Sequence, residues 1–405
     1  MQLPLPPDLS PEDVPAPLRA ILEKLRAGGH RAHLVGGCVR GWLRGEAVRD
    51  FDVATDARPE RVLELFPRAV PIGLRHGTVM VPSACGPVDV TSTRPGASLE
   101  DDLARRDFTV NAMAFDPLAP RFVDPRGGRA DLAAGRLRCV GSAAERLRED
   151  PLRGVRAARF VATLGLFPDA ELEAALPASA AALDGVAPER IRRELEALLA
   201  GAEAGRGVAL LRRTGLEARL VPGAPDDAPL LMDALPSDTE LRWVAWLRGT
   251  RAESILARLR VSRRSAERVT RLLRLHPIDA QADPGSPVSL RRVLARAGED
   301  GVAELLALRE AELAVRAPAG AAEKDPLSSL RAGFDRERGR QDLALHRLDL
   351  ALDGRAVMEI LGCPPGPEVG RALRALTERV LEDPTLNTAE RLREILLERT
   401  HESGE

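Results

Sequence analysis

Three acidic residues in the first quarter of the chain have the spacing of a metal-dependent site. Asp50 and Asp52 are two residues apart, and such residues project to the same face of a strand. Their carboxylates would repel each other unless a cation lay between them, and Mg²⁺ prefers such oxygen ligands. Asp89, within an apolar alternation at 87–91, could be the base that accepts a proton from an attacking hydroxyl. The alternative is that all three are solvated strand residues.

A pair of glycines precedes these acids. Gly36 and Gly37 follow a short apolar run, and backbone N–H groups at such a turn can approach a phosphate closely. Arg40 could add a fixed positive charge to the same phosphate. A Gly-Gly pair is also common in ordinary turns, so the phosphate interpretation depends on the Asp50-x-Asp52 pair that follows.

Short apolar runs bounded by Gly and Pro predict the strands that would position these residues, at 33–35, 51–53, 78–81 and 88–90. Helices are expected at 18–26 and at 59–66, where a proline opens the segment. An α/β unit therefore spans roughly 28–140. Beyond it we expect an all-helical remainder with a linker at 317–326, because apolar residues recur at helical spacing, as at Ile191, Leu195, Leu198 and Leu199, and at Leu256, Leu259, Leu272 and Leu275.

Composition limits the class of protein. With 405 residues the chain is long enough for several domains, which excludes a peptide hormone or a small disulfide-stabilised module. Its 59 basic and 61 acidic residues leave a net charge of −2, so any nucleic-acid surface must be a local patch. The four cysteines form no C-x-x-C pair, which argues against a zinc ribbon. Without a signal-like start or a long apolar run, we expect a soluble, cytoplasmic protein.

Several longer motifs occur in an order that resembles one known family. They are GGCVR at 36–40, RDFDVATDA at 49–57, LRHGTV at 74–79, DDLARRDFTVNAMAFDP at 101–117, VDPRGGRADL at 123–132, EDPLRGVRAARF at 149–160 and PERIRREL at 188–195. This set resembles the bacterial-type (class II) tRNA nucleotidyltransferase and poly(A) polymerase family. The segment 354–370 resembles the C-terminal end of these enzymes, whereas 210–340 matches only loosely.

The resemblance implies an α+β protein with a polymerase-β-like nucleotidyltransferase head followed by an all-helical neck, body and tail. On that basis we expect an N-terminal lead-in and helix at 1–27, the head at 28–140, and a neck that recognises the nucleotide base at 141–205. A helical body would follow at 206–330, and a tail that binds tRNA at 331–405.

The resemblance also implies roles for individual residues. It implies Mg²⁺ as cofactor, with Asp50 and Asp52 as its ligands. The residues expected at the triphosphate are Gly36, Gly37 and Arg40. Those expected at the sugar and phosphates of the incoming nucleotide are Arg105, Arg106, Asp107 and Asn111. Those expected to pair with its base are Glu149, Asp150 and Arg153.

The base assignment has independent chemical sense. Asp150 accepts and Arg153 donates hydrogen bonds, so together they can complement the Watson–Crick edge of cytosine, or of adenine after a small rotation. Asp150 before Pro151 is also what a helix start looks like, and both roles are compatible. Arg156 and Arg159 continue the spacing of three residues; this is a solvated stripe in an isolated helix, but within this family we expect them to point at the nucleotide.

Two departures from the family pattern are informative. Gly41 stands where the family usually has Asp, so any role of that acid must be absent or taken over. Between Arg94 and Asp102 only a short interval remains, whereas family members that add the full CCA carry a longer flexible loop there. A mobile loop could reorient the Asp150/Arg153 pair from cytosine to adenine, and a short tether could not.

The leading hypothesis is therefore tRNA 3′-end maturation with CTP, and with ATP only if the terminal adenosine is added; the short interval favours CC addition. The alternatives are a full CCA-adding enzyme, a poly(A) polymerase, and a non-catalytic RNA-binding protein on the same fold. Residues 73–79 resemble the tRNA-maturing branch more than the polyadenylating one. The presence of Asp50, Asp52, Arg105, Arg106, Asp107, Asp150 and Arg153 together argues against a decayed site.

An arginine-rich segment at 254–276 is the candidate RNA-binding surface. Such density on a helix would neutralise RNA phosphates without reading sequence, although a solvated helix has the same composition. The chain has no Tyr and only 3% aromatic residues, so recognition by tRNA shape fits better than extensive base stacking. The candidate RNA-binding residues are Arg258, Arg263, Arg264, Arg268 and Arg271.

Overall fold

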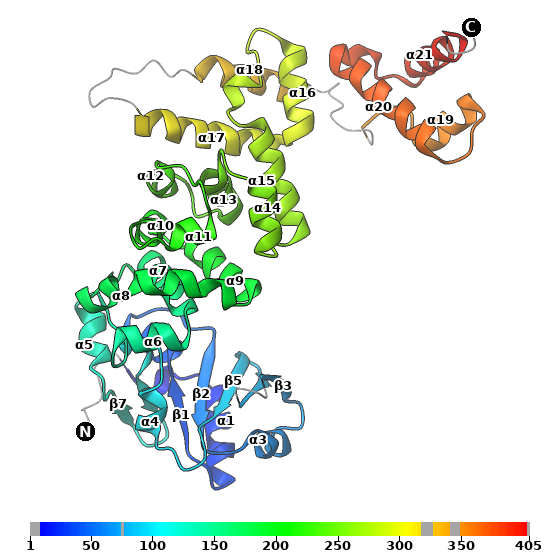
Figure 1. The fold of residues 1–405 in the computed structure, drawn as a ribbon. Coiled ribbons are helices and arrows are strands. Elements are labelled where there is room, and N and C mark those ends of the chain that lie inside the picture. The colour runs from blue at the N-terminus through cyan, green and yellow to red at the C-terminus, as the bar shows by residue number, and fades with distance from the viewer. Residues whose placement is uncertain (1–8, 74–76, 317–326, 341–348, 403–405) are drawn as a thin grey trace. The chain divides into compact units, whose positions relative to one another are not determined.

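The computed structural model describes residues 9–73, 77–316, 327–340 and 349–402 (Figure 1). The chain divides into two compact units, Met1–Pro222 and Gly223–Glu405. The expected linker at 317–326 and residues 74–76 of the LRHGTV motif lie outside the described residues. Among the described helices, none is long and apolar enough to cross a membrane.

A seven-stranded sheet underlies the site in the first unit, in the order β3-β4-β5-β2-β1-β6-β7. The four predicted strands are present as β1 (Ala32–Val35), β2 (Phe51–Thr55), β4 (Thr78–Ser83) and β5 (Gly86–Ser92). Three further strands escaped prediction: two have only three residues, too few to show alternation, and β3 contains Pro71, which argues against a strand. They are β3 (Val70–Gly73), β6 (Ala114–Asp116) and β7 (Arg121–Val123).

The pairing of β2 with β5 brings two of the candidate acids together. These two strands run parallel, whereas the other neighbouring pairs of this sheet are antiparallel. In this register Asp52 lies directly opposite Asp89. Directly opposite residues project to the same face of a sheet, so residues far apart in sequence meet on one surface.

Helices pack against this sheet and close its core. The predicted helices form as α1 (Ala16–Ala27) and α3 (Pro59–Leu65), joined by α2 (Gly37–Leu43), α4 (Leu99–Leu103) and α5 (Gly128–Ala133). Leu18, Leu22 and Leu25 of α1 are fully buried because they recur every three or four residues and share one face. They belong to the same apolar cluster as Val53 and Val90 of the sheet, which holds the strands in place under the site.

The rest of the first unit is helical, as expected, and forms the green helices that follow the sheet in Figure 1. One small exception is a two-stranded sheet of β8 (Arg136–Leu137) and β9 (Phe167–Pro168), of which β9 falls in a region with no strand signal. Ile191, Leu195, Leu198 and Leu199 are buried, which confirms their predicted helical face. The helices are α6 (Ala143–Glu149), α7 (Leu152–Leu164), α8 (Ala170–Ala180), α9 (Pro188–Leu199), α10 (Ala204–Arg213) and α11 (Leu216–Leu220).

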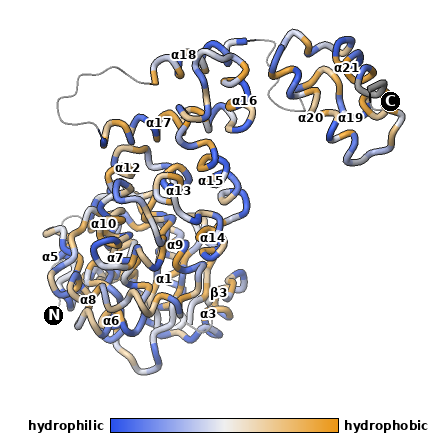
Figure 2. Tube along the Cα trace, turned by 45° about the horizontal axis from the view of Figure 1, so that its top comes forward, coloured by the Kyte–Doolittle hydropathy of each residue, from blue (hydrophilic) through white to orange (hydrophobic). Residues whose placement is uncertain are grey.

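The described part of the second unit consists of helices. Hydrophobic and hydrophilic stretches alternate along α16 and α17 in Figure 2, as amphipathic packing requires. Leu256, Leu259, Leu272 and Leu275 are buried, as their spacing predicts. The α-helices are α12 (Ala228–Ala234), α13 (Thr239–Leu247), α14 (Ala252–Arg258), α15 (Arg263–Leu275), α16 (Pro287–Ala297), α17 (Glu299–Arg316), α18 (Ser328–Arg338), α19 (Gly354–Leu361), α20 (Pro367–Glu382) and α21 (Ala389–Glu402).

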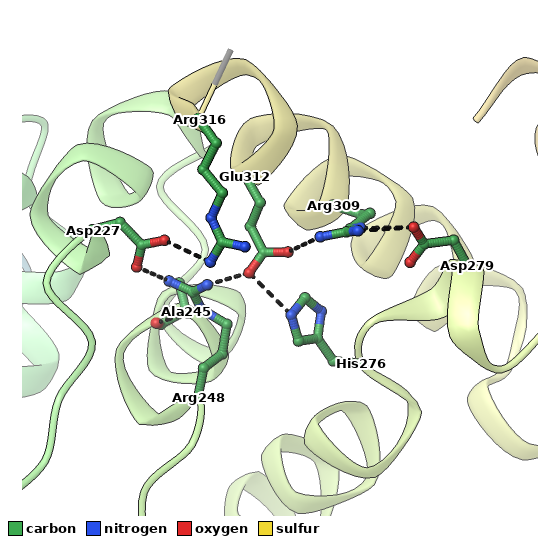
Figure 3. Close-up of polar contacts among 8 residues, drawn as sticks. All are labelled: Asp227, Ala245, Arg248, His276, Asp279, Arg309, Glu312 and Arg316. Atoms are coloured by element: carbon green, nitrogen blue, oxygen red, sulfur yellow. Dashed lines mark hydrogen bonds and ion pairs between the residues drawn. The ribbon is translucent and has the colours of Figure 1, made fainter. Parts of the chain in front are cut away.

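A buried carboxylate, Glu312 of α17, joins several of these helices (Figure 3). Its Oε1 lies 3.1 Å from Nε2 of His276 and also accepts from Arg248, while its Oε2 accepts from Arg309 at 3.1 Å. Burial alone would raise the pKa of Glu312, but the hydrogen bond and charge of His276, with Arg248 and Arg309, lower it to about 2. The network therefore ties the ends of α13 and α15 to α17.

Candidate active site

The turn between β1 and α2 brings a cation and an acid close to the backbone. Gly36 has a φ of +74°, and a Cβ atom there would lie 2.6 Å from Nη1 of Arg106 and 3.3 Å from Oδ2 of Asp52. Glycine adopts this conformation without strain and leaves room for both side chains. The predicted glycine turn is therefore a point of close approach.

A polar cavity of about 570 Å³ opens at this turn. Asp89 and Glu149 are not on its wall, although Asp89 is paired with Asp52 in the sheet and Glu149 pairs with Arg153. The wall also includes Phe160 and Glu46, which the sequence did not single out. The remaining predicted residues all line the cavity: Gly36, Gly37, Arg40, Asp50, Asp52, Arg105, Arg106, Asp107, Asn111, Asp150, Arg153, Arg156 and Arg159.

The three candidate acids repel one another. Burial raises the pKa of Asp52 against the charge of Arg106, and the charges of Asp89 and Asp50 raise it further. Burial, and then the charge of Asp50, raise the pKa of Asp89 as well. Uncompensated carboxylates of this kind suit a divalent cation. Among the described residues no three His, Cys, Asp or Glu side chains form a group that could hold a metal, so any cation here would have Asp50 and Asp52 as its protein ligands.

Asp107 is the buried centre of a second group. Its Oδ1 accepts from the backbone N–H of Phe108 at 2.8 Å and from Nδ2 of Asn111 at 3.0 Å, and Nε of Arg156 lies 2.8 Å from its Oδ2. Burial would raise the pKa of Asp107, but Arg156 and Asn111 outweigh it and lower the pKa. Nη1 of Arg40 donates a hydrogen bond to Oδ1 of the same Asn111 amide. The carboxylate therefore stays ionised and aligns Asn111 and Arg156 along the cavity.

Asp150 and Arg153, the residues expected to read the base, are each held by a different partner. Nη1 of Arg153 donates to Glu149 at 3.0 Å, and its Nη2 lies 3.5 Å from the carbonyl oxygen of Arg105. Oδ2 of Asp150 accepts from Arg190 at 2.7 Å. Glu149 and Arg190, which do not line the cavity, thus restrain these two side chains on its wall.

The helix-start role predicted for Asp150 is present in modified form. Its Oδ1 accepts from the backbone N–H of Leu152 at 3.2 Å, at the beginning of α7. The residue immediately before the helix is Pro151 rather than Asp150. One carboxylate oxygen therefore satisfies the helix end and the other makes the ion pair with Arg190.

Helix α9 supplies two contacts that sequence reasoning missed. Arg190 reaches Asp150, and Glu194, one turn later on the same helix, pairs with Arg159 of α7 at 2.5 Å. Spacing four apart puts both on one face of α9. The PERIRREL motif identifies this segment as part of the family pattern. Its local sequence does not predict the contacts with Asp150 and Arg159, because those residues are 40 and 35 positions away in the chain.

The departure at Gly41 has a steric explanation. This glycine is buried, and a Cβ atom there would lie 2.8 Å from Cγ2 of Val48. An Asp side chain would therefore require Val48 to move. Glu46 supplies a carboxylate in the same area, with its Oε2 3.9 Å from that Cβ position, and it lines the cavity while it pairs with Arg44.

The five candidate RNA-binding arginines do not share one environment. Arg263 and Arg264 are exposed at the start of α15, and Arg263 pairs with Glu267 of the same helix at 2.7 Å. Arg268 is only partly exposed, because it pairs with Glu240 of α13 and Glu304 of α17. Exposed Arg271 lines a second cavity beside Glu253 and Arg274, and Arg258 ends α14.

Family models match most of the chain. The poly(A) polymerase head domain matches 32–97 and 84–138, a probable RNA- and SrmB-binding site of polymerase A matches 165–227, and a putative tRNA nucleotidyltransferase domain 2 matches 237–396. A CCA-adding enzyme of Geobacillus kaustophilus is 32% identical, and the alignment covers 95% of this chain and 97% of that enzyme. The chain belongs to the tRNA nucleotidyltransferase and poly(A) polymerase family.

Other relatives of this nucleotidyltransferase match locally or in fold. A CC-adding tRNA nucleotidyltransferase of Shouchella clausii is 44% identical over 191 residues, which are 47% of this chain and 50% of that one. The crystal structure of the Bacillus stearothermophilus CCA-adding enzyme in complex with CTP superposes with a TM-score of 0.77 at 31% identity, covering 96% and 99% of the two chains. The family, the enzyme class and the α+β fold with a polymerase head and helical body, all predicted from the sequence, are thereby confirmed.

Proposed function

We propose that this tRNA nucleotidyltransferase transfers CMP from CTP to the 3′ end of tRNA with the help of Mg²⁺, and that it stops after two cytidines. The observation that supports nucleotidyl transfer is the convergence in one cavity of Asp50 and Asp52 with arginines from three motifs, those at 36–40, 101–117 and 149–160. The same cavity contains the residues expected to pair with the base.

Asp50 and Asp52 would hold the metal. When bound, Mg²⁺ supplies charge stabilisation for the phosphoryl group that is transferred. Asp89 lies opposite Asp52 on the next strand, and its raised pKa suits a group that takes the proton of the attacking tRNA hydroxyl. The three acids would thus divide into a metal-binding pair and a proton acceptor.

Positive charge in the cavity would bind the triphosphate. The arginines come from α2, from the segment after α4 and from α7, and they line the same cavity as Gly36 and Gly37; they are Arg40, Arg106, Arg156 and Arg159. Guanidinium groups match phosphate oxygens with paired N–H donors. Asn111, held by Asp107, would orient the sugar, and exposed Arg105 would extend the positive wall.

The base would be read by Asp150 and Arg153, supported by Glu149. Their fixed orientations favour a single edge pattern, because Arg190 and Glu149 restrain both side chains. Asp accepts from the N4 amino group of cytosine and Arg donates to its N3 and O2. A pair that stays in this arrangement would select CTP at every step.

The stop after two cytidines is supported by the segment that precedes Arg105, Arg106 and Asp107. Residues 99–103 form α4, which Ser98 and Asp101 close with a reciprocal capping box, so little chain is left between β5 and Arg105. No longer loop is available there to reorient the base-reading pair. A CC-adding tRNA nucleotidyltransferase is among the relatives, at 44% identity over 191 residues, or 47% of this chain.

Full CCA addition is the second candidate, because relatives aligned over nearly the whole chain are CCA-adding enzymes. In that case another segment would reorient Asp150 and Arg153, and ATP would be a second substrate. For tRNA binding we propose the exposed arginines of α14 and α15, which would contact backbone phosphates.

The deciding experiment uses a tRNA transcript that ends at the discriminator base. It is incubated with Mg²⁺ and with CTP, ATP or both, and the products are resolved on a sequencing gel. We expect growth by two nucleotides with CTP, and no further growth when ATP is added. A third, adenosine, nucleotide would show a CCA-adding enzyme, a long adenosine tail a polymerase, and no extension a non-catalytic protein.

A further inference from the structure

Three guanidinium groups of the cavity gather over one buried aromatic ring. The Cζ atoms of Arg159, Arg40 and Arg156 lie 4.1, 5.1 and 5.9 Å from the ring centroid of Phe160. Phe160 is 1% exposed and is itself part of the cavity wall. Such distances fall within the range of cation–π attraction, in which the negative face of the ring attracts the cation.

The ring joins the two halves of the site. Arg40 comes from α2 beside the sheet, whereas Arg156 and Arg159 come from α7. Phe160 makes a T-shaped contact with Phe108, which directly follows Asp107, with ring centroids 5.5 Å apart and an interplanar angle of 86°. The position of each guanidinium relative to the others therefore depends on this ring.

Carboxylates neutralise only some of the three guanidinium groups beside Phe160. Arg156 is beside Asp107 and Arg159 beside Glu194, but Arg40 makes no ion pair with any described residue and only donates to the neutral amide of Asn111. Burial lowers the pKa of Arg40 to about 10, and the charge of Arg159 adds to the effect. Holding this cation beside two others costs free energy, which the ring face offsets.

We propose that Phe160 is a positioning residue that holds Arg40 and Arg159 by its ring face, ready to bind the triphosphate of the incoming nucleotide. This inference rests on the proposed function of the cavity. Without the ring's negative face, the three like charges would separate and lose their common orientation toward the phosphates. The nucleoside part of the ligand would not be affected.

The test replaces Phe160 site-specifically with mono-, di- and trifluorophenylalanine in the full-length enzyme. Fluorine withdraws charge from the ring face while it preserves shape and apolar burial. We measure the dissociation constant of CTP and that of CMP, both without turnover. The expected result is a stepwise weakening of CTP binding, roughly three- to thirtyfold for the trifluoro variant, with CMP binding unchanged.

The matched control is trifluorophenylalanine at Phe122, a buried ring of β7 in the core of the same unit. It should leave CTP binding and the melting temperature as in the wild type. An unchanged CTP constant for trifluoro-Phe160, or an equal loss for CTP and CMP, would overturn the proposal, because either outcome means that the ring only packs or contacts the base. CMP incorporation into tRNA by the wild type is scored separately, so failure of the proposed function is visible on its own.

Discussion

Arg190 of α9 donates a hydrogen bond to Asp150 at 2.7 Å, although the two residues are 40 positions apart in the chain. Asp150 is one of the two side chains proposed to read the nucleotide base, and Arg190 holds it from outside the cavity wall. The pair is partly exposed, at 52% and 29% of the two side chains, so its contribution to overall stability is small. Its importance is the orientation of the carboxylate.

We expect Arg190→Ala to relax base selection more than it lowers stability. The Asp150 carboxylate would be free to rotate, so the ratio of CTP to UTP incorporation should fall several-fold, while the free energy of unfolding changes by less than about 1 kcal/mol. Parallel incorporation assays with each nucleotide and a thermal melt give both quantities. Arg190→Lys should restore part of the selectivity. Arg193→Ala, an exposed arginine on the same helix, is the control; equal ratios in both alanine variants would contradict the assignment.

Asp150→Asn separates the two contacts of this residue. Asn keeps the acceptor at the start of α7 and caps about as well as Asp. It loses the charge that pairs with Arg190 and reverses half of the hydrogen-bond pattern shown to cytosine. We therefore expect an unchanged melting temperature and weaker selection of CTP. If both properties stay at wild-type values, Asp150 serves only the helix end.

Replacement of Asp52 by Ala should abolish metal-dependent turnover. Ala removes a ligand of the metal that would stabilise charge on the transferred phosphoryl group. We therefore expect kcat to fall by about 10³-fold or more, while affinity for tRNA is retained. Mg²⁺ with CTP should raise the melting temperature of the wild type but not of the variant. Asp56→Asn, outside the cavity and paired with Arg31, is the control. Near-normal turnover of the Asp52 variant would exclude the two-carboxylate site.

The arginines of α15 should separate into two classes. Arg264→Ala and Arg271→Ala remove exposed charges, so each should weaken tRNA binding and lower the slope of log affinity against log salt by about 1. Arg268→Ala breaks contacts with Glu240 and Glu304 and should instead lower the melting temperature. Salt titrations of tRNA binding with a melt of each variant test both classes. An unchanged slope in the first two variants would place the tRNA elsewhere.

Glu312→Gln should destabilise the second unit in a pH-dependent way. At neutral pH we expect a loss of about 1.5 to 3 kcal/mol, the usual value of hydrogen bonds to a charged group. The pKa of Glu312 is depressed in the folded state, so its stabilisation is complete above the ordinary value of 4.5 and is lost as the pH falls toward about 2. The free energies of unfolding of the wild type and the variant should therefore become more similar as the pH is lowered. Denaturant unfolding between pH 7 and 3 measures this, with Glu310→Gln, from an exposed pair with Arg331, as the control.

Local pattern was enough to predict the frame of the site. The alternation around Asp52 and Asp89 placed both on strands, and the structure pairs these strands directly. Gly36 was predicted to lie in a turn that leaves its backbone open to a phosphate; the structure shows the turn, with the side chain of Arg106 close to it. The amphipathic leucines of α9 and α15 are buried as expected. A period of two residues in strands, or of three to four in helices, shows which face of the element is buried. Short motifs can be recognised in the sequence without knowledge of the fold.

Tertiary structure alone decided which long polar side chains meet. Nothing near Arg190 in the sequence points to Asp150, and Arg268 has the composition of an RNA-binding residue yet is held by Glu240 and Glu304 from two other helices. The sequence likewise shows Phe160 only as an apolar residue of α7, and its contact with Arg40 depends on how α2 packs against α7. An amphipathic pattern says that a face is covered but not by what, because the partner depends on which element packs across it.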